Sequence, residues 1–133
     1  MKIKQLIVLF GLFAVALAGC QESKPNDEIN LSVEAFAKEI NNEKAYLLDV
    51  RTPGEVAEGV IEGAEVLDFM SKAFQQNYTQ IPKDKSVYLY CRSGNRSGKA
   101  LAFLKEKGYT SVYHLKGGTS AWLQAGQQLK REE

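Results

Sequence analysis

Apolar and polar positions alternate along residues 29–127 in a pattern that predicts helices separated by short buried strands. One helix is expected over residues 33–40, where apolar side chains recur at helical spacing after Ser32, a favoured N-cap residue. Further helices are predicted from the capping pattern Thr52-Pro53-Gly54-Glu55 and over residues 69–78, 97–104 and 119–123. Strands are predicted from short apolar runs at residues 46–48, 64–67, 86–90 and 111–115.

Strands that alternate with helices need crossover connections, which produce parallel pairing. The predicted fold class is therefore α/β, a single domain with a mainly parallel central sheet and helices on both faces. Ligands bind such sheets outside the carboxyl ends of the strands. Cys91 directly follows the run at residues 86–90, so we expect it at that edge.

The first twenty residues have a different pattern. Lys2 and Lys4 precede an apolar run over residues 6–18, which is typical of a secretory signal peptide and short for a membrane span. The run ends in Leu17-Ala18-Gly19-Cys20, which resembles a bacterial lipobox, where the cysteine is lipidated and then becomes the first residue. An ordinary signal peptide ending in a chance cysteine, or an uncleaved anchor, is the alternative.

The lipobox resemblance implies three segments. These are a signal peptide over residues 1–19, the lipidated Cys20 with a polar tether over residues 20–28, and a folded domain over residues 29–133. Lipidation implies a membrane anchor in the bacterial cell envelope, and Gln21 after the cysteine favours the periplasmic face of an outer membrane. Cys91 would then be the single thiol of the mature chain, which excludes an intramolecular disulfide or dithiol mechanism.

Composition excludes one class of partner. The chain is 44% hydrophobic and 25% charged, as an ordinary globular domain is, with a formal net charge of +1. Lys and Arg are spread among nearly equal numbers of Asp and Glu, which argues against nucleic acid as a partner. For so small a module, a monomer is the default expectation.

Cys91 opens a loop whose residue types suit an anion: Arg92, Ser93, Gly94, Asn95 and Arg96. Gly94 and Gly98 allow successive amides to curl into a nest, and the following helix adds the positive end of its dipole. A thiol above such a nest is biased toward the nucleophilic thiolate, while arginine provides fork-shaped donors for an oxyanion. The loop therefore predicts an anionic substrate carrying an atom that a thiolate can attack.

Two reactions fit this loop, attack on phosphorus and attack on sulfane sulfur. Four residues separate Cys91 from Arg96, one fewer than in the loop of cysteine phosphatases. The tighter ring suits a single sulfur atom carried on the cysteine better than an enclosed phosphate. A phosphatase or arsenate reductase is therefore disfavoured.

The segment 91–97 resembles the active-site loop of the rhodanese (thiosulfate sulfurtransferase) family in its small single-domain form. Residues 48–55 resemble the family's early Asp-Val-Arg segment with its Glu, and Gly63-Ala64 its Gly-Ala before the next strand. Residues 108–126 resemble its closing segment with Gly-Gly and Trp. The resemblance covers residues 29–127 and implies a rhodanese-like fold.

The resemblance also implies a ping-pong reaction. Cys91 would take sulfane sulfur from thiosulfate or a polysulfide or persulfide donor and pass it to cyanide or a thiol. The amides of residues 92–96 would hold the persulfide, and Arg92 and Arg96 would meet the donor's oxyanion, with no metal or organic cofactor. The alternative is a carrier module that delivers sulfur from Cys91 to a protein partner without useful free turnover.

Several residues near the loop are interpreted as structural support. Asp49 and Arg51, together with Glu55, are expected to brace the loop, and Arg96 has a structural alternative in which it ties the loop to nearby oxygens. His114 is interpreted as a satisfied strand residue rather than a catalytic base.

The chain departs from the family pattern at two places. Val60 and Glu62 stand where family members commonly carry a His and a Pro. The His is not the nucleophile, so its absence leaves the chemistry intact and bears on local packing and donor preference.

Overall fold

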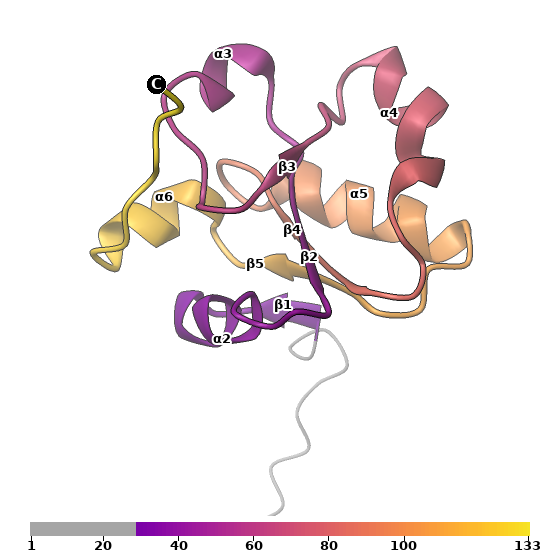
Figure 1. Ribbon diagram of the computed structural model, residues 1–133, viewed down its shortest axis with the longest axis horizontal. Helices are drawn as coiled ribbons and strands as arrows, with labels where there is room; N and C mark the ends of the chain where they lie inside the picture. Colours follow the sequence, from indigo (N-terminus) through magenta and orange to yellow (C-terminus); the bar gives the residue numbers. More distant parts are fainter. Residues whose placement is uncertain (1–28) are drawn as a thin grey trace, which may run out of the picture.

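Five strands form one sheet in the order β1-β5-β4-β2-β3, and every neighbouring pair is parallel. The computed structural model describes residues 29–133, so the predicted signal peptide, Cys20 and tether lie outside the described residues (Figure 1). The strands are β1 (Asn30–Leu31), β2 (Ala45–Asp49), β3 (Glu65–Val66), β4 (Ser86–Tyr90) and β5 (Val112–Leu115). This confirms the predicted α/β class.

Helices cover both faces of the sheet, as predicted (Figure 1). They are α2 (Val33–Glu39), α3 (Pro53–Val56), α4 (Lys72–Asn77), the 3₁₀ turn η1 (Tyr78–Gln80), α5 (Asn95–Glu106) and α6 (Gly118–Gln124). Within residues 29–133, none of these is long and apolar enough to cross a bilayer.

The alternation of side chains along β4 divides the core into two layers. Val87 and Leu89 pack in one apolar cluster with residues of α4 and α5, and Cys91 continues that series. Tyr88 and Tyr90 point to the opposite face, into a cluster that contains Phe36 of α2 and Trp122 of α6. Because successive strand residues face opposite sides, the position of Cys91 in the sequence places its side chain toward α5.

Two helix starts and one strand differ from the sequence-based expectation. The helix α4 begins at Lys72 rather than at residue 69, because Asp68 first forms a turn in which its carboxylate accepts from the Met70 amide. The helix α5 begins at Asn95, since Gly94 lies in the left-handed region with φ +95° and ends the loop early. The strand β1 was missed because two residues are too short for a periodic signal.

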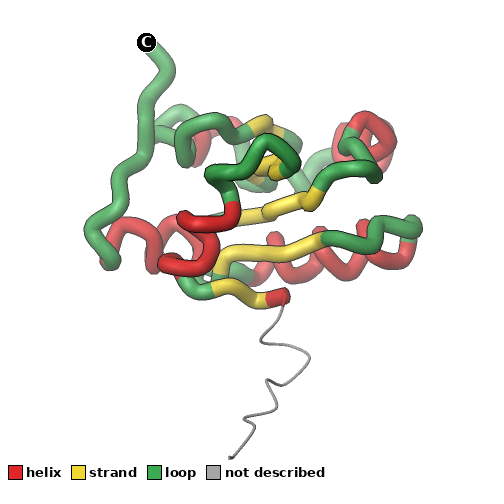
Figure 2. The backbone as a smooth tube through the Cα atoms, turned by 60° about the horizontal axis from the view of Figure 1, so that its bottom comes forward, coloured by secondary structure: helices red, strands yellow, loops and turns green. Residues whose placement is uncertain are grey.

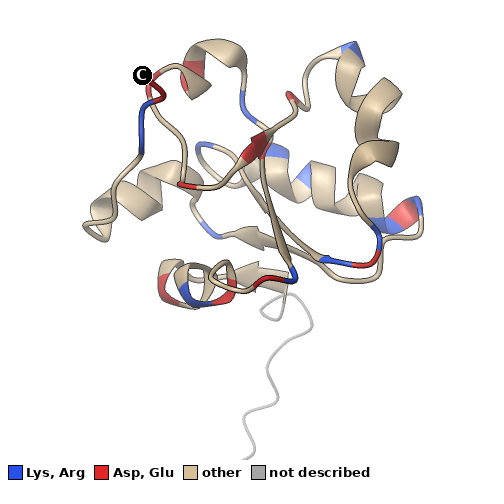
Figure 3. Ribbon diagram, in the orientation of Figure 1, with Lys and Arg blue, Asp and Glu red and all other residues tan. Residues whose placement is uncertain are grey.

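Charged side chains of both signs are interspersed over the elements, including on α2, where Glu34 and Glu39 flank Lys38 (Figure 3). The C-terminal segment that follows α6 is an extended loop (Figure 2). This segment pairs with the chain near residue 60, through an antiparallel bridge between Val60 and Lys130.

Candidate active site

Cys91 lies at the carboxyl end of β4, the edge at which parallel sheets place their ligands. Its side chain is fully buried, with 0% of the residue exposed. The sequence prediction of its position is therefore correct, and the thiol sits beneath the loop rather than on the surface.

The loop after Cys91 turns its amides toward the sulfur atom. The Gly94 amide donates to Sγ over 3.1 Å, and Ser97 Oγ lies 3.5 Å from Sγ. Burial raises the pKa of the Cys91 thiol, but the hydroxyl and amide of Ser97 and the amides of Ser93 and Gly94 together outweigh burial and lower this pKa. The geometry thus favours the thiolate at a site that excludes water.

The N-terminus of α6 forms hydrogen bonds with the backbone of the loop. The Thr119 amide donates to the Cys91 carbonyl over 2.9 Å, and the Ser120 amide donates to the Arg92 carbonyl over 3.1 Å. Gly118 has φ +57°, and a Cβ there would collide with the carbonyl oxygens of Cys91 and Arg92. Glycine at residue 118 is therefore required for this close approach of two backbone segments.

Arg96 is engaged by Glu55 rather than presented to the loop centre. Its Nη1 and Nη2 donate to Oε2 and Oε1 of Glu55, each over 2.7 Å. Hydrogen bonding from Arg96 lowers the pKa of Glu55 from 4.5 to about 2, although partial burial opposes this. The structural role that the sequence left open for Arg96 is the one observed, and a contact with substrate stays a prediction.

Asp49 and Arg51 form a buried pair, as expected, but Glu55 does not join it through its carboxylate. Arg51 Nη2 donates to Asp49 Oδ2 over 2.7 Å and to the Gly59 carbonyl over 2.6 Å. A longer contact of 3.4 Å joins Arg51 to the Glu55 carbonyl. The pair therefore braces the segment 55–59, which in turn places Glu55 against Arg96.

The remaining predicted loop residues face solvent. Ser93 and Asn95 are exposed, as is Arg92, which forms no ion pair within residues 29–133. Arg92 lines a small cavity of about 140 Å³ together with residues that include Thr119 and Ser120. Of the two arginines, Arg92 is the one whose charge is available to an anion.

Residues 32–125 match the family described as "Rhodanese-like domain". The chain belongs to the rhodanese family. A sulfurtransferase of Allochromatium vinosum is 42% identical over 86 residues, which cover 65% of this chain and 78% of that protein. A tRNA uridine(34) hydroxylase of Sinorhizobium fredii is 32% identical over 127 residues, covering 90% of this chain but 39% of that longer protein.

A solved structure shows the same fold. The rhodanese-related protein of Thermoplasma volcanium superimposes with a TM-score of 0.70 at 24% identity, covering 77% of this chain and 98% of that one. This agreement confirms a single rhodanese-like domain with a parallel five-stranded sheet.

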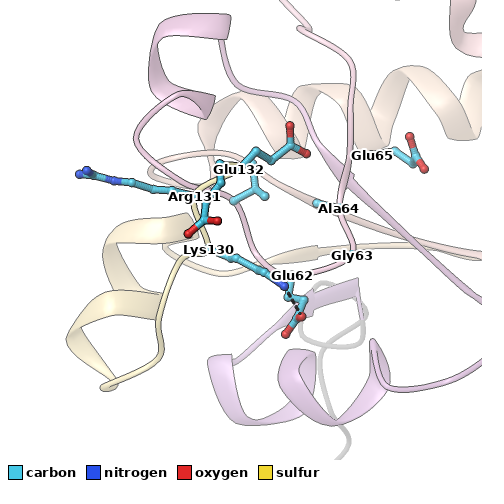
Figure 4. Close-up of a pocket in the computed structure, with 9 residues that line it drawn as sticks. Glu62, Gly63, Ala64, Glu65, Lys130, Arg131 and Glu132 are labelled. Atoms are coloured by element: carbon cyan, nitrogen blue, oxygen red, sulfur yellow. Dashed lines mark hydrogen bonds and ion pairs between the residues drawn. The ribbon is translucent and has the colours of Figure 1, made fainter.

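The departures from the rhodanese pattern lie where the C-terminal segment pairs with the chain. The Val60 amide donates to the Lys130 carbonyl over 2.9 Å, the Lys130 amide donates back over 2.7 Å, and the Val60 side chain is 8% exposed. Lys130 Nζ also lies 2.9 Å from Glu62 Oε1 on the surface. An open hollow of about 900 Å³ beside this pairing is lined by residues 62–65 and 130–133 and does not include Cys91 (Figure 4).

Two residues near the thiol were not assigned to the site from sequence. Ser97 is buried beside Cys91, and its hydroxyl lies 3.0 Å from Nδ1 of His114. A hydroxyl at the start of the helix after the loop was the available signal for Ser97. No sequence signal joins His114 to it, since the two lie seventeen positions apart on different elements. Among residues 29–133, no group of three or more His, Cys, Asp or Glu is placed to hold a metal ion.

Proposed function

We propose that the chain moves sulfane sulfur from thiosulfate, or from a polysulfide or persulfide donor, to cyanide or a thiol through a persulfide on Cys91. Membership of the rhodanese-like sulfurtransferase family supports the reaction class. The observation that carries the proposal is the Cys91 thiol, buried, with its pKa lowered and its sulfur held 3.1 Å from the Gly94 amide.

The reaction has two displacement steps at sulfur. The Cys91 thiolate attacks the outer sulfur of thiosulfate, the S–S bond breaks, and sulfite leaves with the electron pair. Cyanide or a thiolate then attacks the terminal sulfur of the persulfide, which releases thiocyanate or a new persulfide and restores the Cys91 thiolate. Charge and electrons balance in both steps without a redox partner.

The loop geometry supports attack on sulfur over attack on phosphorus. The amide of Gly94 and the hydroxyl of Ser97 approach Sγ itself, where they stabilise negative charge on sulfur. The guanidinium of Arg96, which would have to clamp a phosphoryl group, has both terminal nitrogens bound to Glu55.

Sulfur loading of the full-length chain tests the proposal. The detergent-purified protein is incubated with thiosulfate or polysulfide and freed of excess donor, and its mass is measured before and after cyanide. We expect the Cys91 peptide to gain one sulfur atom, cyanide to remove it, and the Cys91→Ser variant to gain none there. Cys20 has its own peptide and serves as an internal control.

Other outcomes would redirect the assignment. Rapid loading with very slow discharge to cyanide and small thiols would identify a sulfur carrier for a protein partner. Absence of loading from both donors would overturn the sulfurtransferase proposal for this chain.

We also propose that the chain is a lipoprotein of the cell envelope, anchored through Cys20. The support is the sequence pattern alone, a basic start, an apolar run and small residues leading into the cysteine. A donor and acceptor that reach the envelope would then be the relevant substrates.

A further inference from the structure

We propose that His114 is a positioning residue for Cys91, and that it acts by donating a hydrogen bond from Nδ1 to the hydroxyl oxygen of Ser97. The hydroxyl proton of Ser97 is thereby directed to the Cys91 sulfur. This inference rests on the proposed function, because it concerns the same nucleophile.

The three side chains form a continuous line from the strand β5 to the nucleophile. Nδ1 of His114 lies 3.0 Å from Ser97 Oγ, which lies 3.5 Å from Cys91 Sγ. Ser97 is fully buried, so water does not take the place of these partners. Within the described residues, the Gly94 carbonyl, at 3.3 Å, is the other group that Ser97 Oγ contacts.

The number of available protons determines whether Nδ1 of His114 or Oγ of Ser97 is the donor in their contact. A serine hydroxyl has one proton to donate and two lone pairs that accept. The Cys91 thiolate and the Gly94 carbonyl are both acceptors. The Gly94 carbonyl already accepts from the Gly98 amide over 3.0 Å, so it does not depend on the hydroxyl proton. If Nδ1 of His114 carried no proton, it would compete with the thiolate for the single hydroxyl proton, and one of the two would lose this hydrogen bond, which is costly. A proton on Nδ1 satisfies the hydroxyl oxygen and leaves its own proton for the sulfur.

The fold holds the imidazole ring in place for this contact. The strand β5 lies between β1 and β4, and His114 pairs in register with Leu89 of β4 and Asn30 of β1. On α5, Gly98 lies against the ring, and a Cβ there would lie 3.5 Å from Cε1, at ordinary van der Waals distance.

The surroundings of His114 favour the neutral form of its ring. Burial lowers the pKa of His114, and no charged neighbour contributes to this shift. Among the charged groups around the loop, Arg96 is paired with Glu55, and Arg92, Lys99 and Lys116 are exposed. In the neutral form, a ring with a fixed tautomer can orient Ser97.

The hydrogen bond serves both half-reactions. In the first step, Ser97 stabilises the attacking thiolate and raises its population. In the second step, the bond between Sγ and the terminal sulfur breaks and Sγ leaves as a thiolate, so the same donor stabilises the leaving group.

Alkylation of Cys91 across pH tests the relay without any sulfur transfer. The rate of reaction with iodoacetamide, followed on the Cys91 peptide, reports the thiolate fraction. We expect His114→Leu and Ser97→Ala each to raise the apparent pKa of Cys91 by about one pH unit. His114→Asn, whose amide can place a donor near the position of Nδ1, should restore most of the effect. Tyr113→Phe, on the same strand but stacked on Tyr88 on the opposite face, is the matched control and should change nothing.

A double variant separates a relay from a general disturbance. In the Ser97→Ala background, His114→Leu should cause no further rise, because the hydroxyl through which His114 acts is gone. An equal rise in both backgrounds, or no rise from His114→Leu alone, would overturn the proposal.

The wild-type protein gives a second test that needs no substitution. His114 is the single histidine of the sequence, so its ring nitrogens are assigned without ambiguity in a protein purified without a histidine tag. We expect ¹⁵N NMR to show a neutral ring with the proton on Nδ1. A proton on Nε2 alone would overturn the proposal. Both tests are independent of sulfur loading, so failure of the proposed function and failure of this inference are distinguishable.

Discussion

At the scale of single residues, the two arginines of the loop, Arg92 and Arg96, differ in their contacts. Arg96 is bound through two nitrogens to Glu55, whereas Arg92 is exposed beside a small cavity and forms no ion pair within the described part of the chain. Under the proposed function, Arg92 is therefore the arginine of the loop that is free to bind an anionic donor.

Replacing Arg92 should weaken donor binding more than turnover. We expect Arg92→Ala to raise the KM for thiosulfate about tenfold with a smaller change in kcat, because a charge-assisted contact to the sulfonate is lost. Steady-state kinetics with thiosulfate measure this. Lys99→Ala, which removes an exposed positive charge from α5, is the matched control. Equal effects from both substitutions would contradict a specific contact.

The Glu55–Arg96 pair predicts a particular acid sensitivity. The pKa of Glu55 is lowered to about 2 by Arg96, below its ordinary 4.5, so the pair stabilises the fold above about pH 4.5. This contribution is lost as the pH falls toward 2, where the carboxylate takes up a proton. Urea unfolding at several pH values should show that wild-type stability falls more steeply over this range than that of Glu55→Gln. Parallel curves for the two proteins would show that the ion pair contributes nothing.

At the scale of elements, the active loop is held by the start of a helix that follows it in sequence by more than twenty positions. The amides of Thr119 and Ser120 bind the carbonyls of Cys91 and Arg92, and Gly118 permits the approach. The first turn of α6 has free backbone donors, as every helix does, and here the loop carbonyls accept from them.

Two glycines allow the effect of losing this contact to be separated from the effect of backbone strain alone. Gly118→Ala and Gly126→Ala both place a Cβ at positive φ, but the Cβ collides with the loop carbonyls at residue 118 and meets nothing within 4 Å at residue 126. We expect a loss of about 3 kcal/mol in the free energy of unfolding for Gly118→Ala and about 1 kcal/mol for Gly126→Ala. Denaturant unfolding and sulfur loading measure both variants. Similar losses in the two would show that the close approach is unimportant.

At the scale of the whole molecule, one parallel sheet brings distant segments to a common edge. The carboxyl ends of β2 and β4 lie side by side, with Asp49 paired in register with Tyr90. The C-terminal segment pairs with the chain at Val60, one of the two positions that depart from the rhodanese pattern. The site is thus built from parts of the chain that lie far apart in sequence.

Membrane anchoring through a lipid on Cys20 is a prediction for the whole chain. We expect Cys20→Ser to abolish lipid attachment and to leave residues 1–19 on the chain, because the cysteine is the acceptor of the lipid and cleavage follows lipidation. Mass spectrometry of the N-terminus measures both changes. Cys91→Ser is the control and should stay lipidated. A wild-type N-terminus without lipid on Cys20 would contradict the lipoprotein proposal.

The sequence by itself determined the α/β class, most of the strands and helices, and the place of Cys91 after a buried strand. These depend on short-range periodicity and on capping residues such as Ser32, which act within a few positions of the chain. It did not determine where helices α4 and α5 begin, because local turns at Asp68 and Gly94 override the apolar pattern.

Only the tertiary structure decided the partners of the site. Glu55 meets Arg96 across forty-one positions, and Ser97 meets His114 across seventeen. A charge or a hydroxyl has no sequence period that reveals its partner, because such contacts are made when separate elements pack at one edge of the sheet. The folded sheet therefore settled which charges brace the loop, and it placed Ser97 and His114 beside the thiol.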